Sequence, residues 1–366
     1  KISAGLNSRK HLTSLSSVRS LKMKTLDDIK KIKSIDKSRM LRQLNEFPRQ
    51  CREALDIGSR FSAKINLKEI NKIVFAGMGG SAIGADLVKS YLARESRLPI
   101  VVVRDYFLPR YVDQKSLVFI TSYSGNTEET ISAYTQARAK RAKIIIICSG
   151  GKLLAEAKGK GIPYVVIPSN LIPRAALGYL SIAPLVVLSK IGLVKDQSKP
   201  IKETAKALEG LRDNSLGIGI KQNKNIAKQI AKRLFGKFVI IYAAIDGLEA
   251  VVTRFRGQLA ENSKTLSWSH IFPEMNHNEI VGWQHPKDLF KHLSVVFLKD
   301  KDDYYRTKSR MDITKKILKD EGVQIIDINT QGKSLLSRIF SLIYICDFVS
   351  FYLAIINKTD PTPVDK

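Results

Sequence analysis

The sequence predicts an α/β protein with two domains, each a parallel β-sheet flanked by helices. Strand-like apolar runs alternate with helical patterns along most of the 366 residues, and this alternation occurs in two series. Such alternation is typical of parallel sheets, because parallel neighbours are joined by crossover helices. The chain length and its 44% hydrophobic content allow two substantial cores.

The first series predicts an N-terminal domain over 23–200. Helical patterning from Thr25 to about Gly58 precedes the first strand. Helical runs at 174–191 and 202–213 lead out of the domain, with a linker between Gly192 and Asn214. The expected strands are short apolar runs, with helical segments between most of them. These runs are residues 73–76, 100–104, 117–121, 144–148 and 164–167.

The second series predicts a C-terminal domain over 214–366. The apolar stretch 339–356 is interrupted by Ser341, Asp347 and Ser350, so we expect a buried helix and no membrane span. The strands expected in this half are residues 238–243, 265–269, 294–298 and 324–328.

The first strand runs into a glycine-rich turn, in the sequence IVFAGMGGSAIG. Gly77, Gly79 and Gly80 have no Cβ, which lets the backbone approach a ligand closely. Ser81 can cap the following helix or bond a phosphate oxygen. Unpaired N–H groups at the start of that helix also attract anions, so the turn predicts an anion site.

A second turn, in LVFITSYSGNTEET, brings Ser122, Ser124 and Thr127 onto one short loop. Gly125 and Asn126 suit a left-handed turn there. Hydroxyls and amides bind a phosphate ester without a metal. Two such turns side by side therefore predict a phosphate site, whereas either one alone would be a common polar turn.

A dinucleotide site is the competing interpretation of the first turn. Gly77, Gly79 and Ala82 satisfy the G-x-G-x-x-G/A pattern, and Asp105 follows the next strand, near the place of a ribose-binding acid. The hydroxyl turn favours a sugar phosphate, because a dinucleotide fold does not require a second phosphate-binding loop.

The net charge of +27 raises nucleic acid as a partner. The lysines are spread through amphipathic stretches without interleaved aromatic residues, so we expect a solvated basic surface and no nucleic-acid partner. Cys51, Cys148 and Cys346 are widely spaced, which predicts reduced thiols and a cytoplasmic protein.

Four histidines fall close together, but their spacing matches no metal-binding motif, so we expect no metal. They are His270, His277, His285 and His292. His277 stands apart because its setting, PEMNHNEIVGW, is polar and loop-like. The alternative is a surface histidine bonded within a turn.

Glu261 and Arg174 are further candidates for chemistry. Glu261, in QLAENSK, lies where a helix ends, although an acid is unfavourable beside the negative end of the helix dipole. A solvated turn glutamate is the alternative. Arg174, in IPSNLIPRAALGYL, begins an apolar helix and can pair with an anion or cap a packed segment.

The two chain ends carry separate expectations. Residues 1–22 have five basic and no acidic residues, no starting methionine and much serine. They lack the apolar core of a signal peptide, and a clean amphipathic pattern opens at Met23. We expect a disordered extension before a natural start at Met23. The other end stops abruptly after DPTPVDK.

Several motifs together resemble the bifunctional phosphoglucose/phosphomannose isomerase family, which is built from two sugar isomerase (SIS) domains of flavodoxin-like type. The resemblance runs in order from about Met23 to Lys366. The motifs are GMGGSAIGADL, SYSGNTEET, PRAALGYL, AENSK, PEMNHNEIVGW and DPTPV.

The resemblance implies an enzyme that interconverts glucose 6-phosphate, and mannose 6-phosphate, with fructose 6-phosphate without a cofactor. It implies that Glu261 moves a proton between C1 and C2 through a cis-enediol, and that Arg174 stabilises the enediolate oxygens. His277 matches a residue that assists ring opening from the neighbouring subunit of a homodimer. The sugar phosphate is held by loops matching Gly80, Ser81, Ser122, Ser124 and Thr127.

One departure concerns a further catalytic lysine, which the family carries on a helix beyond DPTPV. This chain ends at Lys366, so we expect a C-terminal truncation rather than a substitute role for Lys366. Two other functions stay open. One is a non-catalytic SIS module that senses a sugar phosphate, and the other is an amino-sugar phosphate isomerase.

Overall fold

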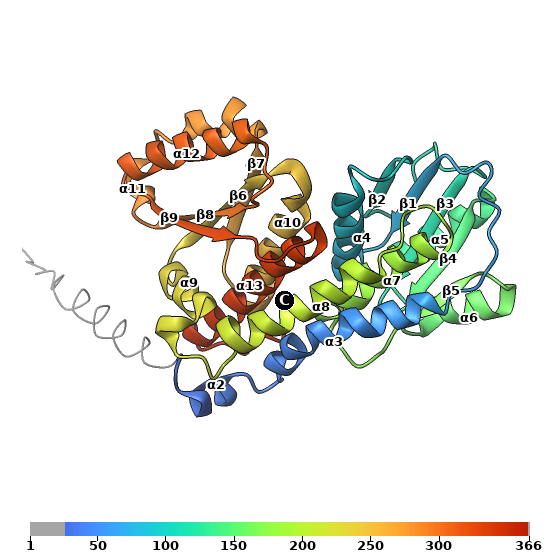
Figure 1. Cartoon of the computed structure of the whole chain (residues 1–366), viewed down its shortest axis with the longest axis horizontal. Coiled ribbons are helices and arrows are strands. Elements are labelled where there is room, and N and C mark those ends of the chain that lie inside the picture. Colours follow the sequence, from blue (N-terminus) through green and yellow to red (C-terminus); the bar gives the residue numbers. More distant parts are fainter. Residues whose placement is uncertain (1–25, 365–366) are drawn as a thin grey trace, which may run out of the picture.

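The computed structural model describes residues 26–364 and contains two parallel sheets, one in each half of the chain (Figure 1). The first sheet has the strand order β2-β1-β3-β4-β5, and the second has the order β7-β6-β8-β9. The first is the flavodoxin-like order. The predicted class, two parallel-sheet domains flanked by helices, is therefore confirmed. The extension predicted over 1–22 and the question of Lys366 lie outside the described residues.

The first half contains each strand predicted for it, with ends that shift by a single residue at most. Its elements are α2 (Ile29–Ile35), α3 (Met40–Ser59), β1 (Lys72–Ala76), α4 (Gly79–Leu92), β2 (Ile100–Val103), β3 (Ser116–Ser122), α5 (Glu128–Ala139), β4 (Lys143–Cys148), α6 (Gly151–Lys160), β5 (Tyr164–Val166), η1 (Pro173–Ala175) and α7 (Leu177–Lys190). The central strand β3 is buried along its whole length. Its sequence SLVFITS is mostly apolar, as expected for a strand covered on both faces.

The second half follows through helix α8, which occupies most of the predicted linker. Its elements are α8 (Ser198–Leu211), η2 (Arg212–Leu216), η3 (Gln222–Lys224), α9 (Ile226–Leu234), β6 (Phe238–Ala244), α10 (Ile245–Ser263), β7 (Ser267–Phe272), η4 (Glu274–His277), η5 (Glu279–Gly282), α11 (Lys287–Phe290), β8 (Leu293–Lys299), α12 (Tyr305–Asp320), β9 (Gln324–Asn329) and α13 (Leu335–Ile356). Helix α8 packs on both α3 and α13, so the connection between the halves is a packed helix.

The prediction placed the start of one strand, residues 265–269, two residues too early, because β7 begins at Ser267. Lys264 adopts a left-handed conformation with φ of 54°, and the amide of Thr265 donates to the carbonyl of Leu259 at 3.0 Å. Residues 264 and 265 therefore close helix α10. The strand β7 starts only at Ser267, where extended backbone resumes.

Helix α13 is a core element of the protein. Within the described residues it is the one helix that is long and apolar enough to cross a membrane. Its apolar stretch is nevertheless buried inside the protein. It packs against α8, α9 and α10. A helix that is apolar on every face is expected where neighbours cover every face. The predicted buried helix is confirmed.

Helices α4 and α10 pack against each other between the two sheets (Figure 1). Helix α4 starts just after β1, at the carboxyl edge of the first sheet, and α10 starts directly after β6. Ligands of open α/β sheets bind beyond the carboxyl ends of the strands. The junction between the domains is therefore the place to look for a site.

Candidate active site

The two turns predicted to bind an anion touch each other at the carboxyl edge of the first sheet. Helix α4 begins at Gly79, and Ser81 lies buried in its first turn. The hydroxyl of Ser81 accepts a hydrogen bond of 3.2 Å from the amide of Tyr123, which directly follows β3. A buried hydrogen bond thus joins two turns that lie far apart in the sequence.

The second loop is held together by its own hydroxyl groups. Ser122 Oγ lies 2.9 Å from Thr127 Oγ1 and accepts a 3.1 Å bond from the amide of Gly125. Ser124 Oγ accepts from the amide of Asn126 at 3.2 Å. Ser122 is buried, whereas Ser124 is exposed. The loop leads straight into helix α5, whose N-terminus favours an anion.

Two glycines permit close approaches that a larger residue would block. A Cβ atom on Gly125, which has a φ of +69°, would lie 1.8 Å from the carbonyl oxygen of Gly150. A Cβ on Gly80 would lie 2.7 Å from the carbonyl oxygen of Pro173 and 3.3 Å from the Cα of Arg174. Gly80 therefore lets the glycine-rich turn after β1 pack against the segment that carries Arg174.

Arg174 and Glu261 meet at the domain junction. Arg174 lies on η1 and is buried, and its Nη1 is 3.3 Å from Glu261 Oε2. Glu261 lies in the last turn of α10, with its side chain 45% exposed. Burial lowers the pKa of Arg174 and the Glu261 charge opposes that shift, but a guanidinium stays protonated. The glutamate is thus accessible to a ligand and has a cation beside it.

Arg174 is fixed by a buried polar ladder between α10 and α13. Its Nε donates to Asn262 Oδ1 at 2.9 Å, and Asn262 Nδ2 donates to Ser350 Oγ at 2.9 Å. Arg254 Nη2 donates to the carbonyl of Arg174 at 3.0 Å and to Asp347 Oδ2 at 2.7 Å. Burial raises the pKa of Asp347, while the ion pair with Arg254 acts in the opposite direction.

The sequence prediction did not include this ladder. A usable signal was the spacing of Arg254, Gln258 and Asn262 on α10, because residues four apart share one face of a helix. All three side chains are buried. Asp347 on α13, which also accepts from Gln258 Nε2 at 3.0 Å, was noted only as an interruption of an apolar stretch.

His277 is not brought to Glu261 within this chain. It ends the short helix η4 and is exposed. In the described part of the chain no hydrogen bond or ion pair joins it to Glu261, Arg174 or the phosphate-type loops. Nearby, Glu279 accepts hydrogen bonds from Tyr242 and from Trp268 and so anchors the loop.

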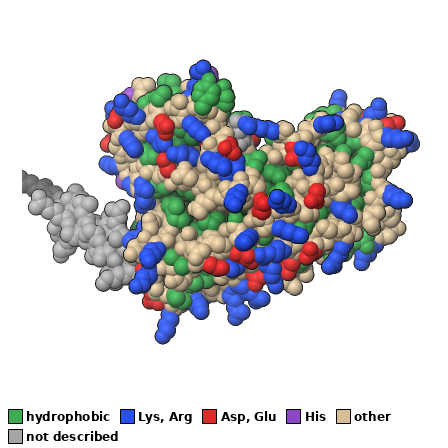
Figure 2. All heavy atoms as spheres, viewed as in Figure 1, with side chains coloured by type: hydrophobic (Ala, Val, Ile, Leu, Met, Phe, Trp, Pro, Cys, Tyr) green, Lys and Arg blue, Asp and Glu red, His purple; other side chains and the backbone are tan. Residues whose placement is uncertain are grey.

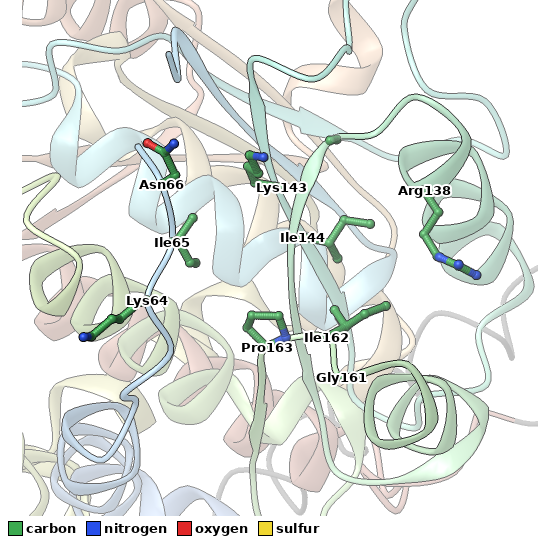
Figure 3. Close-up of a pocket in the computed structure, with 10 residues that line it drawn as sticks. Lys64, Ile65, Asn66, Arg138, Lys143, Ile144, Gly161, Ile162 and Pro163 are labelled. Carbon is green, nitrogen blue, oxygen red and sulfur yellow. The ribbon is translucent and has the colours of Figure 1, made fainter. Parts of the chain in front are cut away.

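No metal centre is evident among residues 26–364, where no three His, Cys, Asp or Glu side chains gather as ligands. A cavity of about 400 Å³ lies at the amino ends of β4 and β5, the edge opposite the phosphate-type loops. Ile65, Ile144 and Pro163 line it, while Lys64 and Arg138 point away from one another (Figure 3). This cavity is separate from the site at the domain junction.

Two observations bear on the remaining alternatives. The carboxylate of Asp105, the candidate ribose acid, accepts from the amide of the next residue, Tyr106, at 2.6 Å. Lys and Arg side chains are spread over the visible face of the molecule and do not gather into one patch (Figure 2).

Comparison with known proteins places both halves in one superfamily. Residues 66–159 match the family described as SIS domain, and residues 223–366 match the bacterial phospho-glucose isomerase C-terminal SIS domain. Among solved structures, a glucose-6-phosphate isomerase like protein from Thermus thermophilus superposes with a TM-score of 0.61 at 17% identity. That match covers 92% of this chain and 97% of the other, and it supports the fold.

Two curated relatives match at least four fifths of the chain, and both are named bifunctional phosphoglucose/phosphomannose isomerase. The protein from Caldicellulosiruptor bescii is 44% identical over 89% of this chain and 96% of its own length. The protein from Aquifex aeolicus is 39% identical over 80% of this chain and 87% of its own length.

Proposed function

Because this chain belongs to the bifunctional phosphoglucose/phosphomannose isomerase family, we propose how its two domains divide the catalytic work. The protein is an enzyme, an aldose-ketose isomerase that interconverts glucose 6-phosphate and mannose 6-phosphate with fructose 6-phosphate. The observation that carries the proposal is the contact of the first domain's glycine-rich turn, at Gly80, with the segment that carries Arg174, whose guanidinium lies beside Glu261 of the second domain.

The first domain would hold the phosphate group of the sugar. Exposed Ser124 and half-buried Thr127 offer hydroxyls, and the starts of α4 and α5 offer unpaired backbone amides. Loops of this kind bind a phosphate through neutral hydroxyl and amide donors, so the charged side chains Arg174 and Glu261 are left to act at the reacting carbons. The proposed phosphate-binding residues are Gly79, Gly80, Ser81, Ser122, Ser124 and Thr127.

The second domain would supply the base. The Glu261 carboxylate takes the proton from C2 of the open-chain aldose while the C1 carbonyl oxygen gains the negative charge of the enediolate. The same carboxylate then returns the proton to C1 while the hydroxyl proton of O2 passes to O1, which gives the ketose. Arg174 Nη1, beside Glu261 Oε2 at 3.3 Å, is placed to stabilise the charged oxygens.

His277 would act in the active site of a partner subunit. Its exposure and its lack of a bond to Glu261 within the described chain support donation across a homodimer interface, where it would assist ring opening. Val281, four residues further along the chain, is an exposed apolar side chain that offers a surface for such a contact. The free thiols of the buried cysteines support a cytoplasmic setting.

The test of the function is a coupled assay with both aldose phosphates. Glu261→Gln keeps the shape of the side chain but removes its basicity, so we expect kcat to fall about a hundredfold or more. Glu249→Gln, a change to another exposed glutamate on the same helix, is the matched control and should retain kcat. Near-normal turnover by Glu261→Gln would reject the assigned base.

The same assay separates the other functions. An amino-sugar isomerase would prefer glucosamine 6-phosphate to mannose 6-phosphate, and a sensor would bind sugar phosphates without turning them over. We expect turnover that survives a chelator, because the proposed steps use only side chains of this chain. Loss of activity on chelation would contradict the metal-free mechanism.

The donation of His277 is testable by mixing two inactive variants. Random exchange of Glu261→Gln and His277→Ala subunits makes half of the dimers mixed, each with one intact site, so about a quarter of wild-type activity should return. If His277 served its own subunit, every site would carry a defect and no activity would return.

A further inference from the structure

The segment from Asp360 to Pro363, here called the C-terminal strap, is held by the two cations that flank Glu261. Arg174 Nη2 donates to the carbonyl oxygens of Pro361 at 2.9 Å and Thr362 at 2.7 Å. Lys264 Nζ donates to the carbonyl of Pro363 at 2.6 Å and also to the backbone carbonyl of Glu261. Three successive carbonyls of the strap thus face the proposed active site.

The other end of the strap is tied to the N-terminal helices. Asp360 Oδ2 accepts from the amide of Ser38 at 3.0 Å and from its hydroxyl at 2.8 Å. Ser38 lies in the short connection between α2 and α3. Asp360 Oδ1 also accepts from the amide of Thr362 at 3.1 Å, which folds the strap back on itself.

The strap depends on these bonds because of its composition. Pro361 and Pro363 have no N–H group, so neither can be held through its amide. The carbonyl oxygens of Pro361, Thr362 and Pro363, the Thr362 amide and the Asp360 carboxylate all take part in the bonds described above, whereas the buried hydroxyl of Thr362 has no partner. A displacement at Asp360 would therefore be passed on to the carbonyls that Arg174 binds.

Those carbonyls also decide where the Arg174 guanidinium points. The group is planar, so its five N–H donors lie in a fixed fork. Bonds from Nε to Asn262 and from Nη2 to the strap fix that plane, which leaves Nη1 facing Glu261. The position of Nη1, which would stabilise the enediolate, is set from two sides.

We propose that Asp360 and Ser38 form a latch that positions Arg174 for catalysis through the C-terminal strap. This inference rests on the proposed function, because it assigns Arg174 to the enediolate. Neither latch residue touches the reacting atoms, so both are positioning residues. Disrupting the latch should reduce kcat while the first domain's phosphate site keeps its affinity, because the strap's bonds described above run to Ser38, Arg174 and Lys264.

The experiment compares four variants by steady-state kinetics with fructose 6-phosphate. Asp360→Ala removes both bonds to Ser38 and should lower kcat about tenfold, whereas Ser38→Ala removes one bond and should lower it about threefold. Ser38→Thr retains the hydroxyl and should restore kcat. Ser34→Ala removes an exposed hydroxyl bonded within α2 and serves as the matched control, with unchanged kcat.

Inorganic phosphate as a competitive inhibitor provides the second readout. Its inhibition constant should stay within about twofold of wild type in all variants, because the phosphate loops are intact. Unchanged kcat in both Asp360→Ala and Ser38→Ala would overturn the latch, and so would a parallel loss of phosphate affinity. Absence of isomerase activity in the wild-type protein would instead refute the proposed function.

Discussion

The loops that follow β3 and β8 occupy the same place in the two sheets but carry opposite chemistry. Strand β3 lies between β1 and β4, and β8 lies between β6 and β9. The first loop presents Ser124 and Thr127, whereas the second presents Asp300 and Asp302. The shared fold determines where a loop lies, and the side chains determine what the loop can bind.

The Asp300 and Asp302 carboxylates of the second loop are bonded from within the protein. Asp300 Oδ2 accepts from Arg338 Nε at 2.8 Å and from Thr330 Oγ1 at 2.8 Å, and Arg338 also pairs with Asp302. The Asp300 and Arg338 side chains are each 7% exposed. An internal ion pair thus occupies the position that corresponds to the proposed phosphate site. The second domain contributes to catalysis elsewhere, at the end of α10.

The largest effect is expected from breaking this ion pair. Arg338→Met leaves the buried Asp300 carboxylate without its cation, so the free energy of unfolding should fall by about 3 kcal/mol. Denaturant unfolding measures that loss, and the KM for fructose 6-phosphate should stay unchanged in the folded enzyme. A changed KM at unaltered stability would mean that the second loop binds substrate.

A carboxylate placed in the first loop should make it resemble the second. Ser124→Asp puts a negative charge next to the proposed phosphate position, and Coulomb repulsion should raise the KM for fructose 6-phosphate on the order of a hundredfold. Ser124→Asn has nearly the same shape without the charge and is the matched control. Equal KM values for the two variants would show that no phosphate binds there.

Removing one hydroxyl from the first loop should have a smaller effect. Thr127→Val keeps the shape of the side chain but removes the oxygen that lies 2.9 Å from Ser122 Oγ. The loss of one hydrogen bond to a charged ligand should raise KM about fivefold to tenfold with little change in kcat. Steady-state kinetics would contradict the assignment if kcat fell and KM did not change.

The smallest expected effect is on the stability of the protein at acidic pH. Burial raises the pKa of Asp300, but bonds from Arg338, the Asp302 amide and Thr330 outweigh it, so the pKa is lowered overall. The stability from this lowering is present above about pH 4, the unfolded value, and is lost as the pH falls through the folded pKa. Asp300→Asn should therefore flatten the acid limb of the stability curve. An unchanged slope below about pH 4 would argue against the lowered pKa.

The fold was predictable from sequence because its signals are local. The runs that became β1, β3 and β8 are short, apolar and bounded by turn residues, and a parallel sheet buries such runs on both faces. Strand β7 was misplaced because the left-handed residue Lys264 extends the end of α10, and a lysine carries no sequence signal for that conformation.

The site was predictable only where its residues lie in compact motifs. The motif SYSGNTEET alone predicted the hydroxyl loop. Glu261 and Arg174 became candidates because of the residues next to them in the sequence. The ladder from Arg174 to Asn262 and the latch from Ser38 to Asp360 join residues far apart in the chain. Only the fold brings such partners together, so no local pattern could identify them.

The central claim is that Glu261 moves a proton between two carbons of a sugar anchored by the other domain. Isomerisation in D₂O, followed by NMR, tests it most directly. The mechanism predicts deuterium at C2 of the aldose phosphates formed from fructose 6-phosphate by wild-type enzyme, and almost none with Glu261→Gln. Deuterium uptake that persists at the wild-type rate in Glu261→Gln would contradict the claim and assign the base to another residue.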